Sequence, residues 1–217
     1  MTHTISRKTT EVILVRHGET GWNAEGRIQG HLDISLNNTG LAQAEAVGCR
    51  FSKDTFDAIF SSDLDRAYRT AVPVAPQQPH AISRTPRLRE RHLGVLQGLT
   101  TAEAERDQPH ACRIWREREV DTALPGGESL AQFHSRVIDF VTDVCRERPD
   151  GRLLLVTHGG VLDAVYRHAV GMPLGAAREF PILNASVNVI RVAPGGWSIE
   201  SWGDVSHLPD ALTLDDT

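Results

Sequence analysis

Two short runs of consecutive apolar residues stand out from an otherwise mixed pattern of polar and apolar positions. Residues 12–15 read Val-Ile-Leu-Val, and residues 153–156 read Leu-Leu-Leu-Val. Short apolar runs bounded by polar residues are typical of strands that are buried on both faces, as in parallel sheets. The pattern therefore predicts two central strands, over residues 11–16 and 152–157.

Other segments carry apolar residues at helical spacing. The strongest stripe includes Leu130, Phe133 and Val137, and it starts just after Glu128 or Ser129. Most of these segments begin at a residue that can cap a helix. We expect helices from residue 38 or 39 to about 52, from 62 or 63 to about 73, over 100–119 with a break at Pro109, from 128 or 129 to 148, and from 159 to about 170.

Shorter segments complete the predicted sheet. Residues 57–61 and 80–84 have strand character, and residues 185–192 and 197–202 flank a Pro-Gly-Gly turn as an edge hairpin would. The alternation of strands and helices predicts the α/β class, as a three-layer α/β/α sandwich with a mostly parallel central sheet. Between the first strand and the first helix, residues 17–37 form a long loop of the kind that is often functional.

The length of 217 residues favours one domain over residues 1–217. We expect residues 1–10 to form a loose N-terminal arm and residues 204–217 to form a loose acidic tail.

Composition narrows the functional classes. A hydrophobic content of 40% and a charged content of 24% are those of an ordinary globular protein. The net charge is −5 without a long basic run, so we expect no nucleic-acid partner. No segment approaches a membrane span or a signal peptide, so we expect no membrane partner. Three cysteines without metal-site spacing favour reduced thiols in a cytoplasmic protein.

Both predicted central strands end in a histidine that is followed by a glycine. The first ends in Arg16-His17-Gly18, and the second is followed by His158-Gly159. Ligands bind at the carboxyl ends of the strands in open α/β sheets. If the two strands are neighbours, both imidazoles project into one crevice beside a cation. The pattern predicts an anion site that contains a nucleophile or a base.

The residues around His17 resemble the signature of the histidine phosphatase superfamily, the phosphoglycerate-mutase-like proteins. Residues 16–23 read Arg-His-Gly-Glu-Thr-Gly-Trp-Asn. Further matching blocks follow in the family's order, and together they span most of residues 11–165. These blocks are residues 27–30, 36–44, 61–71, 88–94, 125–129 and 157–160.

The resemblance implies a role for each of five charged or titratable residues. His17 would attack a phosphoryl group and become a phosphohistidine. Arg16, Arg66 and His158 would bind the phosphoryl oxygens. Glu90 would protonate the leaving oxygen and later activate water.

The resemblance also implies a set of substrate contacts around these residues. Asn23 would add a polar contact from the loop, with Gln29 and Gly30 beside it. Arg91 matches a residue that touches substrate in the mutase branch, and Gly159 begins a helix whose N–H groups can face an anion. No metal and no cofactor is expected, because arginines would neutralise the phosphate charge.

The chemistry of phosphoryl transfer sets requirements that these residues can meet. Charge spreads over three equatorial oxygens, which suits the planar guanidinium group. His17 must be neutral to attack, and neighbouring guanidinium groups should lower its pKa. His158 is most useful to a bound phosphate as a cation, a state that the anion itself would favour. Two plainer interpretations stay open, with Arg66 as a solvated helix residue and Glu90 in a surface ion pair.

These observations favour a metal-independent phosphatase that hydrolyses a small phosphomonoester through a phosphohistidine on His17. The alternative is a phosphoglycerate mutase that uses phospho-His17. A third hypothesis is a non-catalytic phospho-ligand-binding or regulatory protein on the same fold. The substrate is expected to be a small phosphate ester, with specificity set by residues 100–130. Dimerisation is common among similar proteins, so a homodimer is also considered.

Two departures from the mutase pattern argue against that alternative. The mutase branch expects a lysine shortly after residue 99, where this chain has Thr100-Thr101. It also expects paired arginines after the tryptophan at 115, where this chain has Arg116-Glu117. We expect the acidic Glu117 to repel a second carboxylate or phosphate.

Overall fold

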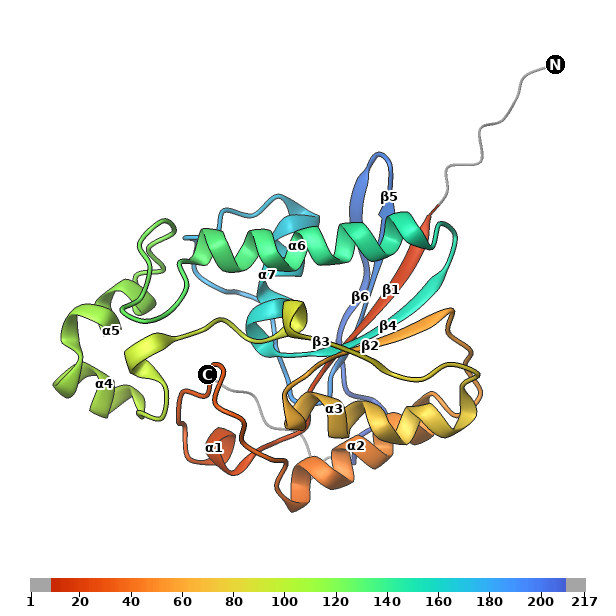
Figure 1. The fold of residues 1–217 in the computed structure, drawn as a ribbon, viewed down its shortest axis with the longest axis horizontal. Coiled ribbons are helices and arrows are strands. Elements are labelled where there is room, and N and C mark those ends of the chain that lie inside the picture. The colour runs from red at the N-terminus through yellow and green to blue at the C-terminus, as the bar shows by residue number, and fades with distance from the viewer. Residues whose placement is uncertain (1–8, 210–217) are drawn as a thin grey trace.

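The structure, a computed structural model, describes residues 9–209, and one six-stranded sheet runs through it (Figure 1). The order across the sheet is β3-β2-β4-β1-β5-β6. β4 pairs in parallel with β1 and β2, and β2 pairs in parallel with β3, whereas β5 is antiparallel to β1 and β6. The predicted hairpin therefore lies at one edge. The strands are β1 (Thr10–Arg16), β2 (Ala58–Ser62), β3 (Ser83–Thr85), β4 (Arg152–Thr157), β5 (Val187–Ala193) and β6 (Gly196–Asp204).

Helices cover both faces of the sheet (Figure 1). Successive side chains of a strand point to opposite faces, so each central strand contributes to two cores. Leu14 and Leu155 pack in one core with residues of α6 (Leu130–Glu147) and α7 (Gly159–Val170). Ile13 and Leu154 pack in the other with residues of α2 (Asn38–Arg50) and α3 (Asp65–Ala71). The predicted three-layer α/β/α sandwich is confirmed.

Helix starts follow the predicted caps to within one or two residues. Ser129 caps α6, because its hydroxyl accepts from the N–H of Gln132 while the Gln132 side chain accepts from the N–H of Ser129. α2 begins one residue earlier than the predicted caps allow, because the Asn37 side chain accepts from the N–H of Gly40. Asparagine at such a position satisfies an N–H that has no partner within the helix.

The predicted cap of α3 is wrong. α3 begins after Leu64 and has no side-chain cap. Asp63 instead accepts two hydrogen bonds from the guanidinium group of Arg89, at 2.7 and 2.6 Å. This pairing also lowers the pKa of the Asp63 carboxyl. The carboxylate is used in a contact between distant segments, which sequence spacing does not reveal.

A separate apolar cluster lies beyond the helical layers, under what we call the roof, residues 100–124. The roof contains α4 (Thr101–Asp107) and α5 (Pro109–Arg116), so the predicted break at Pro109 is confirmed. α4 and α5 lie beyond one end of the sheet (Figure 1). The apolar cluster under the roof consists of Ile28, Leu93, Leu96, Ala104, Ala111, Cys112, Ile114 and Leu124.

A short helix, α1 (Gly21–Ala24), interrupts the loop of residues 17–37.

Ordered structure extends closer to both ends of the chain than predicted. Thr10 is buried and begins β1, so the predicted arm does not include it. Asp204 ends β6, and Leu208 is buried in the core beneath α2 and α3, so the predicted tail does not begin at 204. The remaining parts of the predicted arm and tail, residues 1–8 and 210–217, lie outside the described residues.

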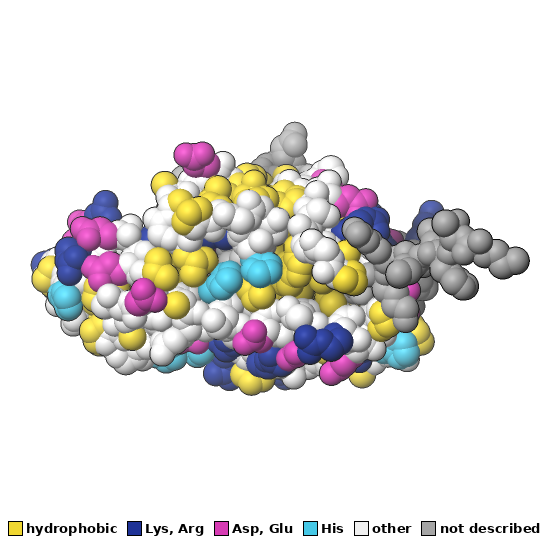
Figure 2. Space-filling view, turned by 90° about the horizontal axis from the view of Figure 1, so that it is seen from above, with side chains coloured by type: hydrophobic (Ala, Val, Ile, Leu, Met, Phe, Trp, Pro, Cys, Tyr) yellow, Lys and Arg dark blue, Asp and Glu magenta, His cyan; other side chains and the backbone are white. Residues whose placement is uncertain are grey.

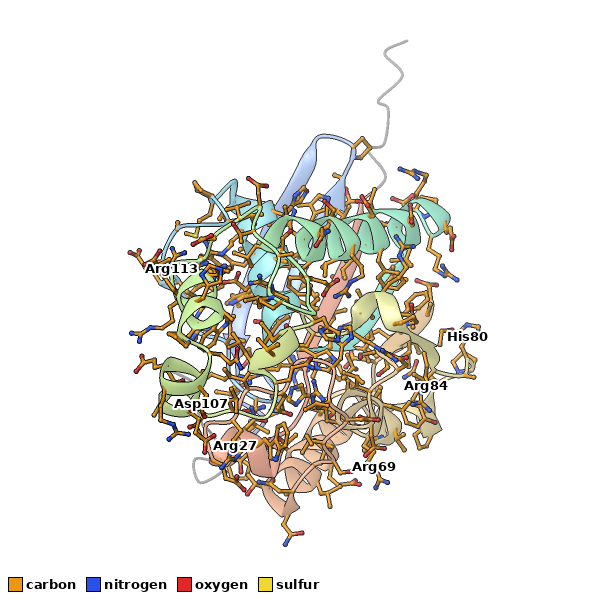
Figure 3. All side chains as sticks on the ribbon, turned by 60° about the vertical axis from the view of Figure 1, so that its left-hand side comes forward. Arg27, Arg69, His80, Arg84, Asp107 and Arg113 are labelled. Atoms are coloured by element: carbon orange, nitrogen blue, oxygen red, sulfur yellow. The ribbon has the colours of Figure 1, made fainter. Side chains whose placement is uncertain are left out.

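The surface carries charges of both signs. Figure 2 shows apolar side chains across the middle of one face, with basic and acidic side chains interspersed towards its rim. Arg69, Arg84 and Arg113 are among the side chains that extend from the outside of the fold (Figure 3). None of the helices described is long and apolar enough to cross a membrane.

Candidate active site

The carboxyl ends of β1 and β4 lie side by side. The parallel register pairs Arg16 with Thr157, so His17 and His158 follow on adjacent strands. The N–H of His17 donates to the carbonyl of Thr157 at 2.8 Å. The two imidazole centroids are 5.1 Å apart. The predicted proximity of the two histidines is confirmed, but only His17 lines the crevice, because His158 is completely buried.

His17 is held in one tautomer. Its Nδ1 lies 2.7 Å from the carbonyl oxygen of Gly18. A carbonyl oxygen only accepts, so Nδ1 carries the hydrogen and Nε2 carries the lone pair. Burial, together with the positive charges of Arg66 and Arg16, lowers the pKa of His17 well below its usual value. His17 is therefore neutral near pH 7, as predicted, with Nε2 able to act as a nucleophile.

His158 is also buried, and its Nε2 lies 2.8 Å from the hydroxyl oxygen of Ser62. Burial and the charges around it, those of Arg66 first, lower the pKa of His158 well below its usual value. Its Nδ1 is buried without a hydrogen-bond partner among residues 9–209. Protein groups alone thus hold His158 neutral, and an anion beside the ring would be needed to favour the cation that we expect.

Two buried arginines face this crevice. The Nη1 of Arg16 donates to the carbonyl of Ile182 at 2.6 Å. Arg66 is 1% exposed and donates to the carbonyls of Leu32 and Gly30, both at 2.8 Å. Burial lowers the pKa of Arg66 to about 10, so it remains a cation at neutral pH. Arg66 has no carboxylate partner in the described part of the chain, and such a buried cation is characteristic of an anion site.

Glu90 lies in the irregular segment between β3 and the roof. One carboxylate oxygen accepts from its neighbour's N–H, that of Arg91, at 2.7 Å. The other accepts from the N–H of Gly160, in the first turn of α7, at 2.9 Å. A side chain at position 160 would collide with this carboxylate, so the contact depends on the glycine. Both bonds fix Glu90 in the wall of the cavity that His17 also lines, and the surface ion-pair interpretation is not supported.

An inner chamber of about 160 Å³ is lined by His17, the two arginines and Glu90, but not by His158. Gln29 lies in its wall with a buried side-chain oxygen that has no hydrogen-bond partner in the described structure. Asn23 is fixed at the chamber because its Oδ1 accepts from the N–H and the hydroxyl of Thr20. The chamber is lined by Arg16, His17, Asn23, Arg27, Ile28, Gln29, Gly30, Arg66, Glu90, Leu93 and Trp115.

Comparison with known proteins identifies the family. The sequence profile of the histidine phosphatase superfamily (branch 1) matches residues 12–205. The chain belongs to this superfamily. Phosphoglycerate mutase-like protein 4 of Arabidopsis thaliana is 43% identical over 204 residues, covering 92% of this chain and 87% of that protein. The metal-independent phosphoserine phosphatase of the same plant is 42% identical over 208 residues, covering 94% and 85%.

A solved structure adds a second line of evidence. A mycobacterial glucosyl-3-phosphoglycerate phosphatase superposes with a TM-score of 0.77 at 32% identity, covering 90% of this chain and 99% of that chain. Members of the histidine phosphatase superfamily use a histidine nucleophile, and this chain is an enzyme of the phosphatase type.

The histidine phosphatase has a second, outer chamber of about 370 Å³. Arg16, Glu90, Leu93 and Trp115 line both chambers, so the two adjoin and the Glu90 carboxyl lies where they meet. The remaining walls of the outer chamber are Arg91, Arg118, Leu130, Phe133, Gly159, Gly160, Asp163, Arg178 and Ile182.

Two predicted binding residues lie outside the inner chamber, and a third, Gly30, lines it in a supporting role. Arg91 and Gly159 line only the outer chamber. The guanidinium group of Arg91 donates twice to the carbonyl of Glu128. Gly30 has a φ of +54°, and its carbonyl accepts from Arg66. Gly30 therefore positions an arginine, and a side chain there would also collide with Gln97.

Several site residues were not predicted from the sequence. Asn184 donates to the carbonyl of His17 at 3.0 Å. Thr70 accepts from the N–H of Gly18 and donates to the carbonyl of Arg66, which joins α3 to the loop that follows β1. Asn184 is a single asparagine in a loop, and no local pattern marks it. Thr70 lies one turn after Arg66, and this spacing could have identified it.

The roof corrects the expectation about Glu117. Glu117 is exposed, pairs with Arg113 and lines neither chamber, so it repels nothing in the site. The outer chamber instead receives Arg118, whose Nη2 pairs with Asp163 at 2.6 Å. A left-handed backbone at Arg118, with φ of +52°, follows the end of α5. The expected cation is thus supplied from a position that the family pattern does not mark.

No group of three or more His, Cys, Asp or Glu side chains able to hold a metal ion occurs within residues 9–209.

Proposed function

We propose that this histidine phosphatase transfers the phosphoryl group of a small phosphomonoester to Nε2 of His17 and then to water. The observation that carries the proposal is the tautomer of His17. The hydrogen bond from Nδ1 to Gly18 leaves the lone pair on Nε2, in a chamber that also contains Arg16 and Arg66. A neutral imidazole beside two cations can attack phosphorus while the cations stabilise the equatorial oxygens.

In the first step, Nε2 of His17 forms a bond to phosphorus as the bond to the leaving oxygen breaks. The proton of a protonated Glu90 passes to that oxygen, so the alcohol leaves neutral. The products of the step are the alcohol, an ionised Glu90 and a phosphohistidine whose Nδ1 keeps its hydrogen on Gly18. Glu90 lines both chambers, which supports this role for an ester whose phosphoryl group occupies the inner chamber and whose alcohol occupies the outer one.

In the second step, water attacks phosphorus and gives a proton to Glu90. The bond between phosphorus and Nε2 breaks, and its electron pair returns to His17. Inorganic phosphate leaves, and both residues regain their starting protonation. These two steps require no metal ion, because guanidinium groups supply the positive charge that stabilises the phosphoryl oxygens.

The outer chamber supports a substrate class. Four guanidinium groups and two carboxylates line it, together with apolar side chains such as Trp115 and Phe133. We propose that the leaving group is a short organic acid whose carboxylate binds Arg118. Phosphoserine, the substrate in the name of the plant relative at 42% identity, has this chemistry and is the first compound to test.

Replacing Arg118 with Gln should lower kcat/KM for phosphoserine about 10–100-fold, because a charge-assisted hydrogen bond to the carboxylate is lost. Hydrolysis of p-nitrophenyl phosphate, which has no carboxylate, should change less than about threefold on the same reasoning. Arg113→Gln, a change at an exposed ion pair of the same roof, is the matched control. Equal losses on both substrates would refute carboxylate binding by Arg118.

The mutase alternative is tested with 3-phosphoglycerate and a bisphosphate primer. We expect release of inorganic phosphate from phosphomonoesters, undiminished by EDTA, and no rapid interconversion of phosphoglycerates. Rapid interconversion without phosphate release would instead establish a mutase, as the name of the 43% identical plant relative suggests for that protein. The cytoplasmic location and the homodimer stay predictions from the sequence.

A further inference from the structure

The segment that carries Glu90 has little regular structure of its own. A single 3₁₀ turn, Pro86–Leu88, is followed by extended residues that belong to no strand. The carbonyl groups along this segment therefore need donors from elsewhere. The Thr157 hydroxyl donates to the carbonyl of Leu88, and Nε2 of His31 lies 2.8 Å from that of Glu90. The side chain that serves the largest number of these carbonyls is Arg136.

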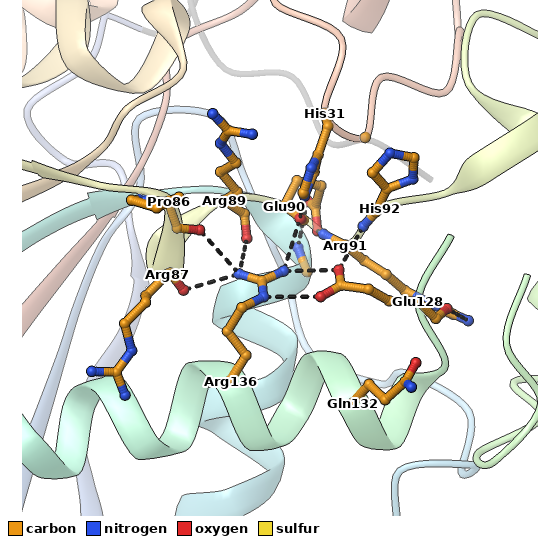
Figure 4. Close-up of polar contacts among 12 residues, drawn as sticks. His31, Pro86, Arg87, Arg89, Glu90, Arg91, His92, Glu128, Gln132 and Arg136 are labelled. Atoms are coloured by element: carbon orange, nitrogen blue, oxygen red, sulfur yellow. Dashed lines mark hydrogen bonds and ion pairs between the residues drawn. The ribbon is translucent and has the colours of Figure 1, made fainter. Parts of the chain in front are cut away.

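Arg136, on α6, donates to the carbonyl groups of four residues of the segment, the first of them Pro86 at 3.5 Å (Figure 4). Its Nη1 lies 2.9 Å from the carbonyl of Arg87 and 3.0 Å from that of Arg89. Its Nη2 lies 3.2 Å from the carbonyl of Glu90 itself. The planar guanidinium group thus fixes the path of the backbone up to the proposed catalytic residue.

Glu128 holds Arg136 in place and also binds the main chain at His92, two residues beyond Glu90. Its two carboxylate oxygens accept from Nε and Nη2 of Arg136, each at 2.9 Å. One of them also accepts from the N–H of His92 at 2.8 Å. Burial opposes ionisation of Glu128, but the bonds from Arg136 and His92 hold the pKa of its carboxyl below the usual value. The carboxylate therefore stays charged, and the pair spans the segment on both sides of Glu90.

The main chain of Glu128 reinforces this arrangement. Its carbonyl accepts both bonds from the guanidinium group of Arg91, and its N–H donates to the carbonyl of His92 at 2.9 Å. Neither Arg136 nor Glu128 lines either chamber. The pair touches the main chain around Glu90 and does not reach the space where a substrate would bind.

We propose that Arg136 and Glu128 form a positioning pair that holds the carboxyl of Glu90 where the two chambers meet. The inference rests on the proposed function, in which Glu90 protonates the leaving oxygen. Proton transfer depends on hydrogen-bond geometry, and a misplacement of about 1 Å can cost about 10²-fold in rate. The loss from a disturbed pair falls on substrates whose leaving group needs the proton.

The test compares kcat/KM across aryl phosphates of different leaving-group pKa, because kcat/KM covers the steps up to departure of the leaving group. Arg136→Ala should lower the value for phenyl phosphate about 10–100-fold and that for 2,4-dinitrophenyl phosphate less than about threefold. Asp143→Asn is the matched control. It breaks the ion pair between Arg87 and α6, the same segment and helix, further from Glu90.

Four outcomes separate the inference from the proposed function. If Glu90→Gln leaves the leaving-group dependence unchanged, the proposed role of Glu90 fails, and the positioning role fails with it. If Glu90→Gln steepens the dependence and Arg136→Ala lowers all substrates equally, only the positioning pair is refuted. If Asp143→Asn steepens it as much as Arg136→Ala, general weakening of the segment explains the effect. If kcat/KM of the Glu90→Gln/Arg136→Ala double variant depends on leaving-group pKa no more steeply than that of Glu90→Gln alone, Arg136 acts through Glu90.

Arg136→Lys provides a variant that keeps the positive charge in case the alanine variant does not fold. An ammonium group cannot serve the carboxylate and the row of carbonyls together, so the dependence should steepen in this variant too. A lysine variant with the wild-type dependence would refute the requirement for the guanidinium geometry.

Discussion

Replacing His17 with alanine should abolish the hydrolysis of every phosphomonoester. The same change should abolish the phosphorylated form of the protein. We expect kcat to fall at least about 10⁴-fold, because the variant has no group in the inner chamber that can form the covalent intermediate. His158 cannot substitute, because its Nε2 is hydrogen-bonded to Ser62 and its side chain does not line the inner chamber. Arg16 and Arg66 remain, so the variant should still bind inorganic phosphate.

The measurement is rapid acid-free denaturation during turnover, followed by mass spectrometry of the peptide that contains His17. The wild-type protein should carry an acid-labile phosphoryl group there, and the variant should carry none. His80→Ala is the matched control, because His80 is exposed at the outside of the fold (Figure 3). Substantial turnover by the His17→Ala protein would disprove the nucleophile assignment.

Replacing Glu90 with glutamine should separate the two halves of the reaction. Glutamine cannot donate a proton to the leaving oxygen, so kcat/KM for phenyl phosphate should fall about 10²–10⁴-fold. For 2,4-dinitrophenyl phosphate, whose leaving group needs no proton, the first step should be nearly unchanged. The second step is slowed for both substrates, because the base that activates water is missing.

Rapid-mixing kinetics checks this expectation. The Glu90→Gln protein should release one equivalent of dinitrophenol per site in a burst and then turn over slowly, with phosphohistidine accumulating. Glu45→Gln, an exposed change on α2, serves as the control. A variant that loses activity equally on all leaving groups and shows no burst would contradict both proposed roles of Glu90.

The central fold and the inner site were predictable because their signals are local. Residues 12–15 and 153–156 are apolar without interruption, which is the pattern of strands buried on both faces. A histidine follows each of these two strands, and the parallel register of the strands places His17 beside His158. The cap of α3 was not predictable, because Asp63 binds Arg89 in preference to an N–H of the helix.

The outer chamber was not predictable for a different reason. Arg118 and Asp163 are 45 residues apart, and only the tertiary structure brings them together. The interpretation of Glu117 was wrong because its place in the motif does not show where its side chain lies. Glu117 pairs with Arg113, and the next residue, Arg118, lines the outer chamber. Arg136 was missed because its contacts to the segment of Glu90 are made with main-chain carbonyls, which leave no trace in the side-chain pattern, and its carboxylate partner Glu128 lies outside the spacing of a helical ion pair.

The separate apolar cluster beneath the roof has a consequence for how substrate range can change. Its members share no residue with the two clusters that hold the sheet between its helical layers. The side chains that stabilise the fold and those that hold α4 and α5 are therefore distinct sets. Mutations in α4 and α5 can thus reshape the roof and the acceptance of new esters without disturbing the packing of the sheet. Ile28, Leu93 and Trp115 also line the inner chamber, so a laboratory library over residues 100–124 should keep Trp115.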